Sequence, residues 1–380
     1  MLLLLLTAAA LIAYGSLYPF NFDLAAYGAG EIHRLLTVDP LGTTRGDILG
    51  NVVLFAPLGL LGAAAVRAGG SAMRVLPVLL LGLAFAAALQ VAQLFLPSRV
   101  PTFTDVVWNG LGLALGTAAT AVPLVRRLLQ NLERNLGASV PGLLIAAWLG
   151  YRLAPFVPSV DFQLVKDSLK PLLLRPQLSA LGVFHDFVAW LIVLHLWASV
   201  RRRGARDRLV LLLIAGVFVA EVFILDNTVS ASNVAGALLA VVVWWLALHR
   251  VPARTSGLAA LLLALLVLQG LAPFDLRAAP ASFHWVPFAG ALGGNMMTAV
   301  ISLLEKLFLY GSLIWLLLES RSGWTRAALA TAGTLALIEA AQTRFAGHTP
   351  EITDPLLAVL LVVLLFLLSG GRRAPAAATS

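Results

Sequence analysis

Amide and carboxylate side chains lie near the ends of three long apolar segments of this sequence. In two segments they form pairs three residues apart, Gln90 with Gln93 and Glu339 with Gln342, so the members of each pair share one helix face. The third segment carries Glu221. If these segments span a membrane, a charged side chain at the helix centre costs roughly 2.5–3.5 kcal/mol and must be paired or line a cavity. The three segments therefore predict buried polar contacts or a polar cleft.

Arginine and aspartate side chains follow the two pairs. Arg99 and Arg344 lie near the ends of the segments, and Asp105 and Asp354 each come twelve residues after the second glutamine. Asn109 lies four residues after Asp105 and shares its helix face. A short hairpin would bring amide or carboxylate, arginine and aspartate side chains together. The aspartates have a competing interpretation, in which each caps the helix that it begins.

A second set of polar residues lies in an earlier apolar segment of each part of the chain. Asp47 and Asn51 occupy this place in the first part, Asp186 in the second, and Glu305 with Lys306 in the third. Adjacent residues do not face each other on a helix, so Glu305 and Lys306 need partners on different helices. Together the two sets predict an outward-facing polar cleft shared by the three parts.

The composition identifies the class of protein. Of 380 residues, 60% are hydrophobic and only 12% are charged, and the mean hydropathy is +0.93. Soluble proteins carry about 25% charged residues, so this chain is expected to be an integral membrane protein with many spans. The chain has no cysteine, and its six histidines are scattered. The sequence therefore gives no indication of a metal centre or another cofactor.

Apolar runs of about 20 residues, long enough to cross a membrane, occur twelve times. They lie near residues 2–18, 47–66, 75–96, 104–125, 139–157, 182–200, 209–225, 230–248, 256–273, 297–318, 325–344 and 352–369. With both chain ends in the cytoplasm, the loops on that side hold 16 of the 26 basic residues and three of the 18 acidic residues. This distribution obeys the positive-inside rule, so the net charge of +8 reflects topology and does not indicate a nucleic-acid partner.

An internal repeat divides the chain into three parts. Each part opens with an apolar helix that stops at a Pro-Phe pair, and the prolines are Pro19, Pro155 and Pro273. From these prolines to Gln90, Glu221 and Glu339 the distances are 71, 66 and 66 residues. Proline and phenylalanine also end helices at a membrane interface for ordinary reasons. The inference of a repeat therefore depends on the matched spacing.

The repeat predicts the domain organisation. Each part contains an even number of spans, so all parts have the same orientation in the membrane. The expected fold class is an all-α integral membrane protein with about 12 transmembrane helices in three parallel four-helix repeats and both termini in the cytoplasm. The repeats occupy residues 1–128, 139–250 and 256–370, and residues 371–380 form a cytoplasmic tail.

The first repeat carries a set of motifs that is typical of one family. The motifs are Arg45-Gly46-Asp47, Asn51 with Phe55-Ala56-Pro57-Leu58-Gly59, Gln90-x-x-Gln93, Arg99, and Asp105-x-x-x-Asn109-x-x-Gly112. Through them, about residues 10–120 resemble the VanZ-like family of membrane proteins. Residues 260–370 resemble it less closely, and the second repeat is included by internal repetition. The family usually has glutamate at the position of Gln90, so this chain lacks a titratable group there.

The resemblance implies a role at the cell envelope of a bacterium, in the plasma membrane, where the founding member of the family is associated with tolerance to a glycopeptide antibiotic. Two functions follow. In the first, a non-enzymatic protein binds or positions a lipid-linked or peptidoglycan-related component, with membrane lipids as its partners. In the alternative, a transporter or membrane enzyme acts on a lipid-linked glycan through the polar cleft. The sequence favours the first function, because it contains no complete set of catalytic residues.

Overall fold

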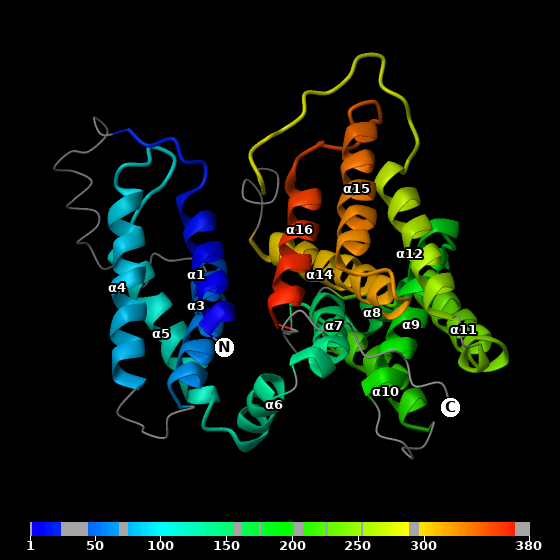
Figure 1. Cartoon of the computed structure of the whole chain (residues 1–380), viewed down its shortest axis with the longest axis horizontal. Helices are drawn as coiled ribbons and strands as arrows, with labels where there is room; N and C mark the ends of the chain where they lie inside the picture. The colour runs from blue at the N-terminus through cyan, green and yellow to red at the C-terminus, as the bar shows by residue number, and fades with distance from the viewer. Residues whose placement is uncertain are drawn as a thin grey trace. The chain divides into compact units, whose positions relative to one another are not determined.

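The computed structural model describes residues 2–23, 45–67, 75–134, 136–155, 162–174, 176–200, 208–224, 227–251, 254–288 and 296–368. Within these ranges the regular structure is helical. The chain forms two compact units, Met1–Arg134 and Asn135–Ser380 (Figure 1). The second unit contains the predicted second and third repeats.

Four apolar helices form the body of the first unit. They are α1 (Leu2–Leu17), α3 (Arg45–Arg67), α4 (Val75–Gln93) and α5 (Phe103–Ala119). Phe55 of α3, Ala86 of α4 and Leu113 of α5 are fully buried in the core between them. Leucine, alanine, valine and glycine are the most frequent residues of these helices, so each buries an apolar face in the unit and presents another to the surroundings.

Glycines let α5 lie directly against the backbone of α3. A Cβ atom on Gly116 would overlap the Ala56 carbonyl oxygen and lie 2.9 Å from the Leu60 nitrogen. A Cβ atom on Gly112 would overlap the Val52 carbonyl oxygen in the same way. The spacing of four residues between the two glycines places both on one face of α5, as in close-packed membrane helices.

Within the described residues, the second unit contains nine α-helices and one short 3₁₀ helix. They are α7 (Leu136–Arg152), α8 (Phe162–Leu173), α9 (Ala180–Val200), α10 (Arg208–Val222), α11 (Ala231–Leu246), η2 (Leu248–Arg250), α12 (Arg254–Leu271), α14 (Met296–Glu319), α15 (Trp324–Gln342) and α16 (Thr353–Leu368). Helix α7 packs against α14, and α12 packs against α9. The first helix of each predicted repeat in this unit therefore contacts the second helix of the other. Trp148, Trp190 and Phe308 fill the core between these four helices, with the two indole rings 4.7 Å apart.

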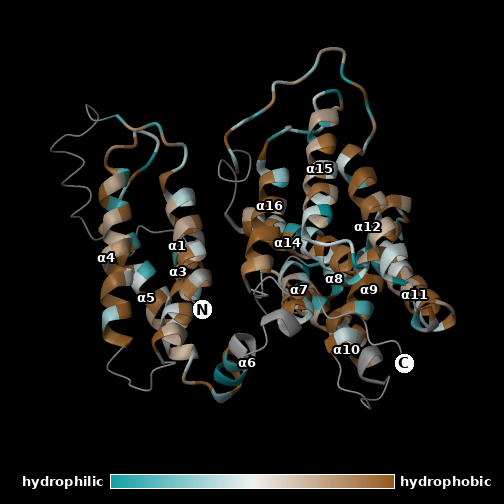
Figure 2. Cartoon of the chain, viewed as in Figure 1, coloured by the Kyte–Doolittle hydropathy of each residue, from teal (hydrophilic) through white to brown (hydrophobic). Residues whose placement is uncertain are grey.

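The all-helical membrane class predicted from composition is confirmed by the apolar helices. Among the described residues, five helices are long and apolar enough to cross a membrane: Ile48–Val66, Val75–Gln93, Ala180–Val200, Arg254–Leu271 and Thr298–Glu319. Four shorter apolar helices accompany them: Leu4–Leu17, Leu212–Val222, Ala231–Leu246 and Thr353–Leu367. Hydrophobic residues cover most of α4 and α16 (Figure 2). The count of twelve spans and the cytoplasmic position of both ends stay predictions.

Two amphipathic helices were absent from the sequence prediction. Helix α6 (Pro123–Arg134) begins inside the span expected at residues 104–125, so the predicted end of that span is wrong. The span ends instead at Ala119, because Pro123 lacks an N–H and is suited to the first position of a new helix. Helix α8 occupies part of an expected loop. Both helices have 12 residues and are amphipathic, with one polar and one apolar face. They contain no apolar run of about 20 residues, which is the pattern that predicts a membrane span.

The close approach of α5 to α3 predicts that Gly116→Ala lowers the free energy of unfolding by about 1–3 kcal/mol, because the added methyl group displaces backbone. Gly333→Ala is the control, since a Cβ atom there meets no atom within 4 Å. The control is expected to raise stability by up to about 1 kcal/mol, from helix propensity alone. Denaturant unfolding of the purified chain in detergent, followed by tryptophan fluorescence, measures both. Equal effects of the two substitutions would contradict the packing.

Candidate functional site

The first helix of each predicted repeat ends at a proline, and side chains from elsewhere hold this end in two repeats. A helix leaves its last four carbonyl groups without partners inside the helix. Gln93 Nε2 donates to the Ser16 carbonyl at 2.7 Å, and Gln342 Nε2 donates to the Gly270 carbonyl at 2.8 Å. Ser16 and Gly270 each lie three residues before the proline. The two predicted glutamines therefore satisfy equivalent helix ends.

A second donor reaches the same helix end from the loop after the glutamine. Arg99 donates from Nε to the Tyr18 carbonyl at 2.9 Å and from Nη2 to the Gly15 carbonyl at 3.2 Å. His348 Nε2 lies 2.6 Å from the Ala272 carbonyl and donates to it. Tyr18 and Ala272 both directly precede the proline. Each end is thus held by one amide and one basic side chain.

The expectation that Arg344 matches Arg99 is wrong. The Arg344 side chain is exposed, and its carbonyl accepts a hydrogen bond from the backbone N–H of Arg277 at 2.8 Å. Arg344 lies two residues after its glutamine, on the turn that ends the helix, and does not reach back. Arg99 and His348 both lie six residues after theirs. The spacing of six residues identifies His348 as the equivalent of Arg99. Residue type does not, because it favours a second arginine.

Gln90 and Glu339 accept equivalent hydrogen bonds. Gln90 Oε1 accepts from the Thr102 N–H at 3.1 Å, and Glu339 Oε2 accepts from the Glu351 N–H at 2.8 Å. In both cases the donor lies twelve residues further along the chain. An amide oxygen and a carboxylate oxygen both accept from an N–H, so Gln90 can replace glutamate in this contact.

The two predicted aspartates link the second and fourth helices of their repeats. Asn51 Nδ2 on α3 donates to Asp105 Oδ1 on α5 at 2.9 Å. On α14, Lys306 forms an ion pair with Asp354 of α16, and the Tyr310 hydroxyl donates to Asp354 Oδ2 at 2.6 Å. Lys306 therefore has its partner on α16, whereas the side chain beside Glu305 is His185 of α9. The two adjacent residues have partners on different helices, as predicted.

The capping interpretation of Asp105 is wrong. The N-cap of α5 is Thr102, whose hydroxyl accepts from the Asp105 N–H at 3.3 Å. Asp105 lies in the first turn, where the helix dipole also favours a negative charge. Asp354 occupies the first turn of α16 in the same manner. Both carboxylates contact the second helix of their predicted repeat.

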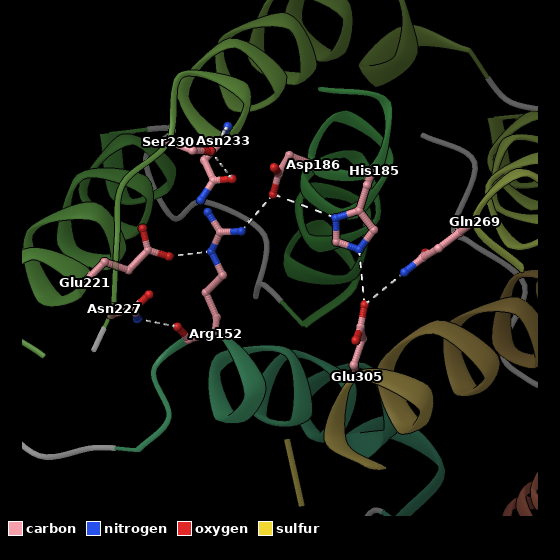
Figure 3. Close-up of polar contacts among 9 residues, drawn as sticks. All are labelled: Arg152, His185, Asp186, Glu221, Asn227, Ser230, Asn233, Gln269 and Glu305. Carbon is pink, nitrogen blue, oxygen red and sulfur yellow. Dashed lines mark hydrogen bonds and ion pairs between the residues drawn. The ribbon is translucent and has the colours of Figure 1, made fainter. Parts of the chain in front are cut away.

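The second repeat builds its cluster around Arg152, at the end of α7 (Figure 3). Arg152 Nη1 donates to Asp186 Oδ1 on α9 at 2.7 Å, and Nε forms an ion pair with Glu221 on α10. With its amide nitrogen toward Asp186, Asn233 of α11 donates to Oδ2 at 2.7 Å. Asn227 Nδ2 donates to the Arg152 carbonyl at 2.9 Å, which places a side-chain donor near this helix end as well. All three ionised side chains are at least nine-tenths buried.

Sequence analysis identified Asp186 and Glu221 but missed their shared partner. Arg152 is the one charged residue in the apolar run 139–157, and it lies three residues before the proline. A single arginine inside a membrane span needs an acidic partner, so Arg152 predicts a contact with an acid. Arg152 ends the first helix of its predicted repeat, whereas basic partners are expected from the sequence near the end of the third helix.

A chain of polar contacts continues from this cluster toward the third repeat (Figure 3). His185 Nδ1 lies 3.9 Å from Asp186 Oδ1, and its Nε2 lies 3.4 Å from Glu305 Oε1 on α14. Gln269 of α12 donates to the same Glu305 oxygen at 3.4 Å. The His185 and Glu305 side chains are 19% and 28% exposed, so this end of the series of polar contacts is partly accessible. The predicted second and third repeats are therefore joined by polar contacts in the second compact unit.

Within the described part of the chain, Asn109, like Arg344, takes part in none of these contacts. Asn109 is buried, and within the described part of the chain its Oδ1 has no hydrogen-bond partner. It lies one turn after Asp105 on α5. The side chain of Asp47, on α3, lies outside the described residues. Among the described residues, no group of three His, Cys, Asp or Glu side chains is placed to hold a metal ion.

An open polar pocket lies beyond the helix ends of the second unit. Its volume is about 320 Å³, and Arg277, Ser282, His284, His348 and Pro350 contribute to its lining. These residues belong to the loops that follow α12 and α15. Most of the predicted polar side chains inside the helices are engaged with one another or with helix ends, whereas this pocket is accessible from the surface.

These features define a multi-pass α-helical membrane protein whose helix ends are held together by buried polar contacts. The sequence model of the VanZ/LLP1 family matches residues 2–125, so the chain carries a VanZ/LLP1 domain there. The match covers α1, α3, α4 and α5, which confirms the resemblance of the first repeat. No curated protein and no solved structure is similar enough to count as a match.

The buried cluster predicts a large effect for Arg152→Gln. The substitution leaves the Asp186 and Glu221 carboxylates without their cation, so we expect the free energy of unfolding to fall by about 3–5 kcal/mol. Denaturant unfolding in detergent measures the loss. Adding Asp186→Asn and Glu221→Gln to the same chain removes the unpaired charges and is expected to restore part of it.

Lys170→Gln is the matched control for this prediction, because it breaks the exposed pair with Asp167 on α8. Exposed ion pairs contribute about 0–1 kcal/mol, so the control is expected to have a small effect. A loss for Arg152→Gln no larger than that of the control would show that the cluster does not stabilise the fold.

Proposed function

We propose that this chain is a cell-envelope protein of the bacterial plasma membrane that binds or positions a lipid-linked or cell-wall component without chemical turnover. The observation that carries the proposal is the contrast between closed and open polar groups. Inside the helices, most of the predicted polar side chains in the described residues pair with one another or with helix ends. The open polar surface lies in the loops beyond α12 and α15. A shallow site at this level suits capture of a ligand at the membrane surface.

Catalysis or transport by the helix-end residues is disfavoured by their contacts. A general base or nucleophile needs a free lone pair or proton within reach of a substrate. Glu221 Oε1 is paired with Arg152, and Glu221 Oε2 is buried without a hydrogen-bond partner among the described residues. Glu339 Oε2 accepts a backbone N–H. Freeing either carboxylate would break a buried contact, which makes both poor candidates for repeated turnover.

The three-repeat organisation is part of the same proposal. It is supported by the matched contacts of the first and third repeats, which involve Gln93 with Gln342 and Gln90 with Glu339 at equal spacings. The residue after the proline adds to this support, since Phe20 and Phe274 have positive φ angles of 62° and 70°. The second repeat supplies its own polar contacts at the same helix ends. We infer four spans in each repeat, with the loops beyond the prolines outside the cell.

The alternative, a transporter or a membrane enzyme acting on a lipid-linked glycan, is favoured by one observation. His185 and Glu305 are titratable, lie 3.4 Å apart and are partly exposed. Such a pair can exchange a proton with a passing ligand, as intramembrane acids and histidines do in proton relays. The alternative therefore depends on the charge of Glu305.

The proposal predicts that the chain retains an isoprenoid-linked or peptidoglycan-related lipid when it is purified from its native membrane in mild detergent. Native mass spectrometry of the intact chain would detect the retained lipid as a discrete added mass. Bulk phospholipid adducts in the same spectrum are the internal control, because they fall with increasing collision energy before a specific ligand does. A spectrum with bulk phospholipid alone would contradict the proposed function.

Glu305→Gln separates the two functions. An amide keeps the contacts with His185 and Gln269, so a binding protein is expected to retain its glycopeptide tolerance within about twofold. A proton-coupled transporter or enzyme is expected to behave like the deletion strain. The measurement is the minimal inhibitory concentration of a glycopeptide for strains that carry the parent, the variant or no gene. Immunoblots establish equal expression of the two proteins.

A further inference from the structure

The pocket beyond α12 and α15 is built by two loops that hydrogen-bond to each other. The Ala281 N–H donates to the Thr343 carbonyl at 2.8 Å, and the His284 N–H donates to the Pro350 carbonyl at 2.9 Å. The Ile352 N–H returns a bond to the His284 carbonyl at 3.0 Å. Figure 1 shows the first of these loops, in yellow, arching over the end of α15. The pocket is thus a defined cavity between paired backbones.

A fixed guanidinium group lines this pocket. Arg277 donates from Nε to the Phe345 carbonyl at 2.8 Å and from Nη2 to the His348 carbonyl at 2.6 Å. Both bonds hold the planar group in one orientation and leave its Nη1 edge available. Guanidinium groups that are held in place recognise phosphate oxygens through paired N–H bonds.

Two further donors in the lining have no described partner. Within the part of the chain that the structure describes, neither the Ser282 hydroxyl nor the His284 imidazole forms a hydrogen bond with the protein, and both residues are exposed. A hydroxyl and an imidazole N–H can each donate to an anion. Together with Arg277 they give the pocket one fixed positive charge and two free donors.

Comparison with the first repeat shows that the positive charge of this pocket is particular to the third. The Asp23 N–H donates to the Phe95 carbonyl as the Arg277 N–H donates to the Arg344 carbonyl, both at 2.8 Å. Asp23 and Arg277 each lie four residues after the proline, so they occupy the same position. The first repeat combines this aspartate with Arg99. The third combines Arg277 with a second basic residue, His348, at the position of Arg99.

The described lining of the pocket contains the basic side chains Arg277, His284 and His348, and no acidic one. An anion in the pocket would therefore meet a positive charge and hydrogen-bond donors.

The surroundings of the pocket identify the kind of anion. Leu276 and Trp285 are each 75% exposed, and Phe274 is 50% exposed, all in the loop that forms the pocket. The Phe283 and Trp285 rings lie 4.8 Å apart. Exposed aromatic and aliphatic side chains at helix ends lie at the headgroup level of a bilayer. A ligand with a phosphate group and an apolar tail would contact both the pocket and this rim.

We propose that the pocket lined by Arg277, Ser282 and His284 binds the phosphate or diphosphate headgroup of an isoprenoid lipid. Arg277 binds the headgroup oxygens through Nη1, and Ser282 and His284 donate to the remaining oxygens. The tail leaves the pocket along Leu276 and Trp285. This assignment rests on the proposed lipid-binding function, and it names the site and the chemical class of the ligand. A cavity of about 320 Å³ is of the size of small-ligand sites.

The test is a binding titration of the full-length chain in detergent, read by native mass spectrometry. Three probes are compared: farnesyl diphosphate, farnesol and inorganic diphosphate. We expect farnesyl diphosphate to bind at least about tenfold more tightly than either of the others, because it alone offers both a charge and a tail. Arg277→Gln is expected to weaken its binding by about tenfold or more.

His284→Gln is a second variant that is expected to fold like the parent chain, because His284 has no described side-chain partner whose loss would disturb the loops. It is expected to weaken farnesyl diphosphate about threefold or more by removing one donor. Arg326→Gln is the matched control, since it removes an exposed arginine at the opposite end of α15. The control is expected to bind like the parent chain, and thermal unfolding compares the folding of all variants.

Equal binding of farnesol and farnesyl diphosphate would overturn the anion site. Equal binding of inorganic diphosphate would overturn the lipid and indicate a soluble phosphate compound. Retention of full affinity by both Arg277→Gln and His284→Gln would move the ligand elsewhere. If native membranes yield a bound isoprenoid lipid that these variants still retain, the pocket assignment fails while the proposed function stands. If they yield none although farnesyl diphosphate binds here, the proposed function fails instead.

Discussion

The carbonyl groups at the end of a membrane helix impose the constraint on which this structure depends. A bilayer offers no water to these groups, so each needs a partner from the protein. In the proposed first and third repeats, a glutamine from the third helix binds the end of the first helix. Gln93 and Gln342 therefore fix where one helix stops relative to another. The loop that follows is held at the same place by Arg99 or His348, so in each compact unit the ends of these helices form a layer of polar contacts.

Within this layer the geometry recurs while the chemistry changes. The second and fourth helices are joined by Asn51 with Asp105 in the first repeat and by Lys306 with Asp354 in the third. In the proposed second repeat, Asp186 contacts both Arg152 and Asn233. An amide thus performs this linking role in the first and second predicted repeats, and an ammonium group does so in the third. The requirement is a satisfied polar contact at that depth, which many residue pairs meet.

The sequence predicted the features that depend on composition and spacing along one helix. It predicted the membrane class, the helical segments, the VanZ/LLP1 resemblance and most of the polar residues. It did not predict which residues meet, because contacts between helices depend on helix rotation and loop path. Arg344 was chosen by residue type, whereas His348 occupies the matching position. Arg152 was missed since its two acids come from different helices that follow much later in the chain. Helices α6 and α8 were missed because their apolar residues are spread around amphipathic faces and never form a run.

The division between paired helix ends and variable loops also explains where repeats can acquire separate roles. A change at Gln93 or Asp105 exposes a buried polar group, so the layer of helix ends resists change in every repeat. The loops beyond it carry no such penalty, because their backbones pair with each other and their side chains meet solvent or lipid headgroups. Asp23 in the first repeat and Arg277 in the third form the same backbone bond with opposite charges. One scaffold can therefore present an acidic loop in one repeat and a basic pocket in another without altering the helices that support them.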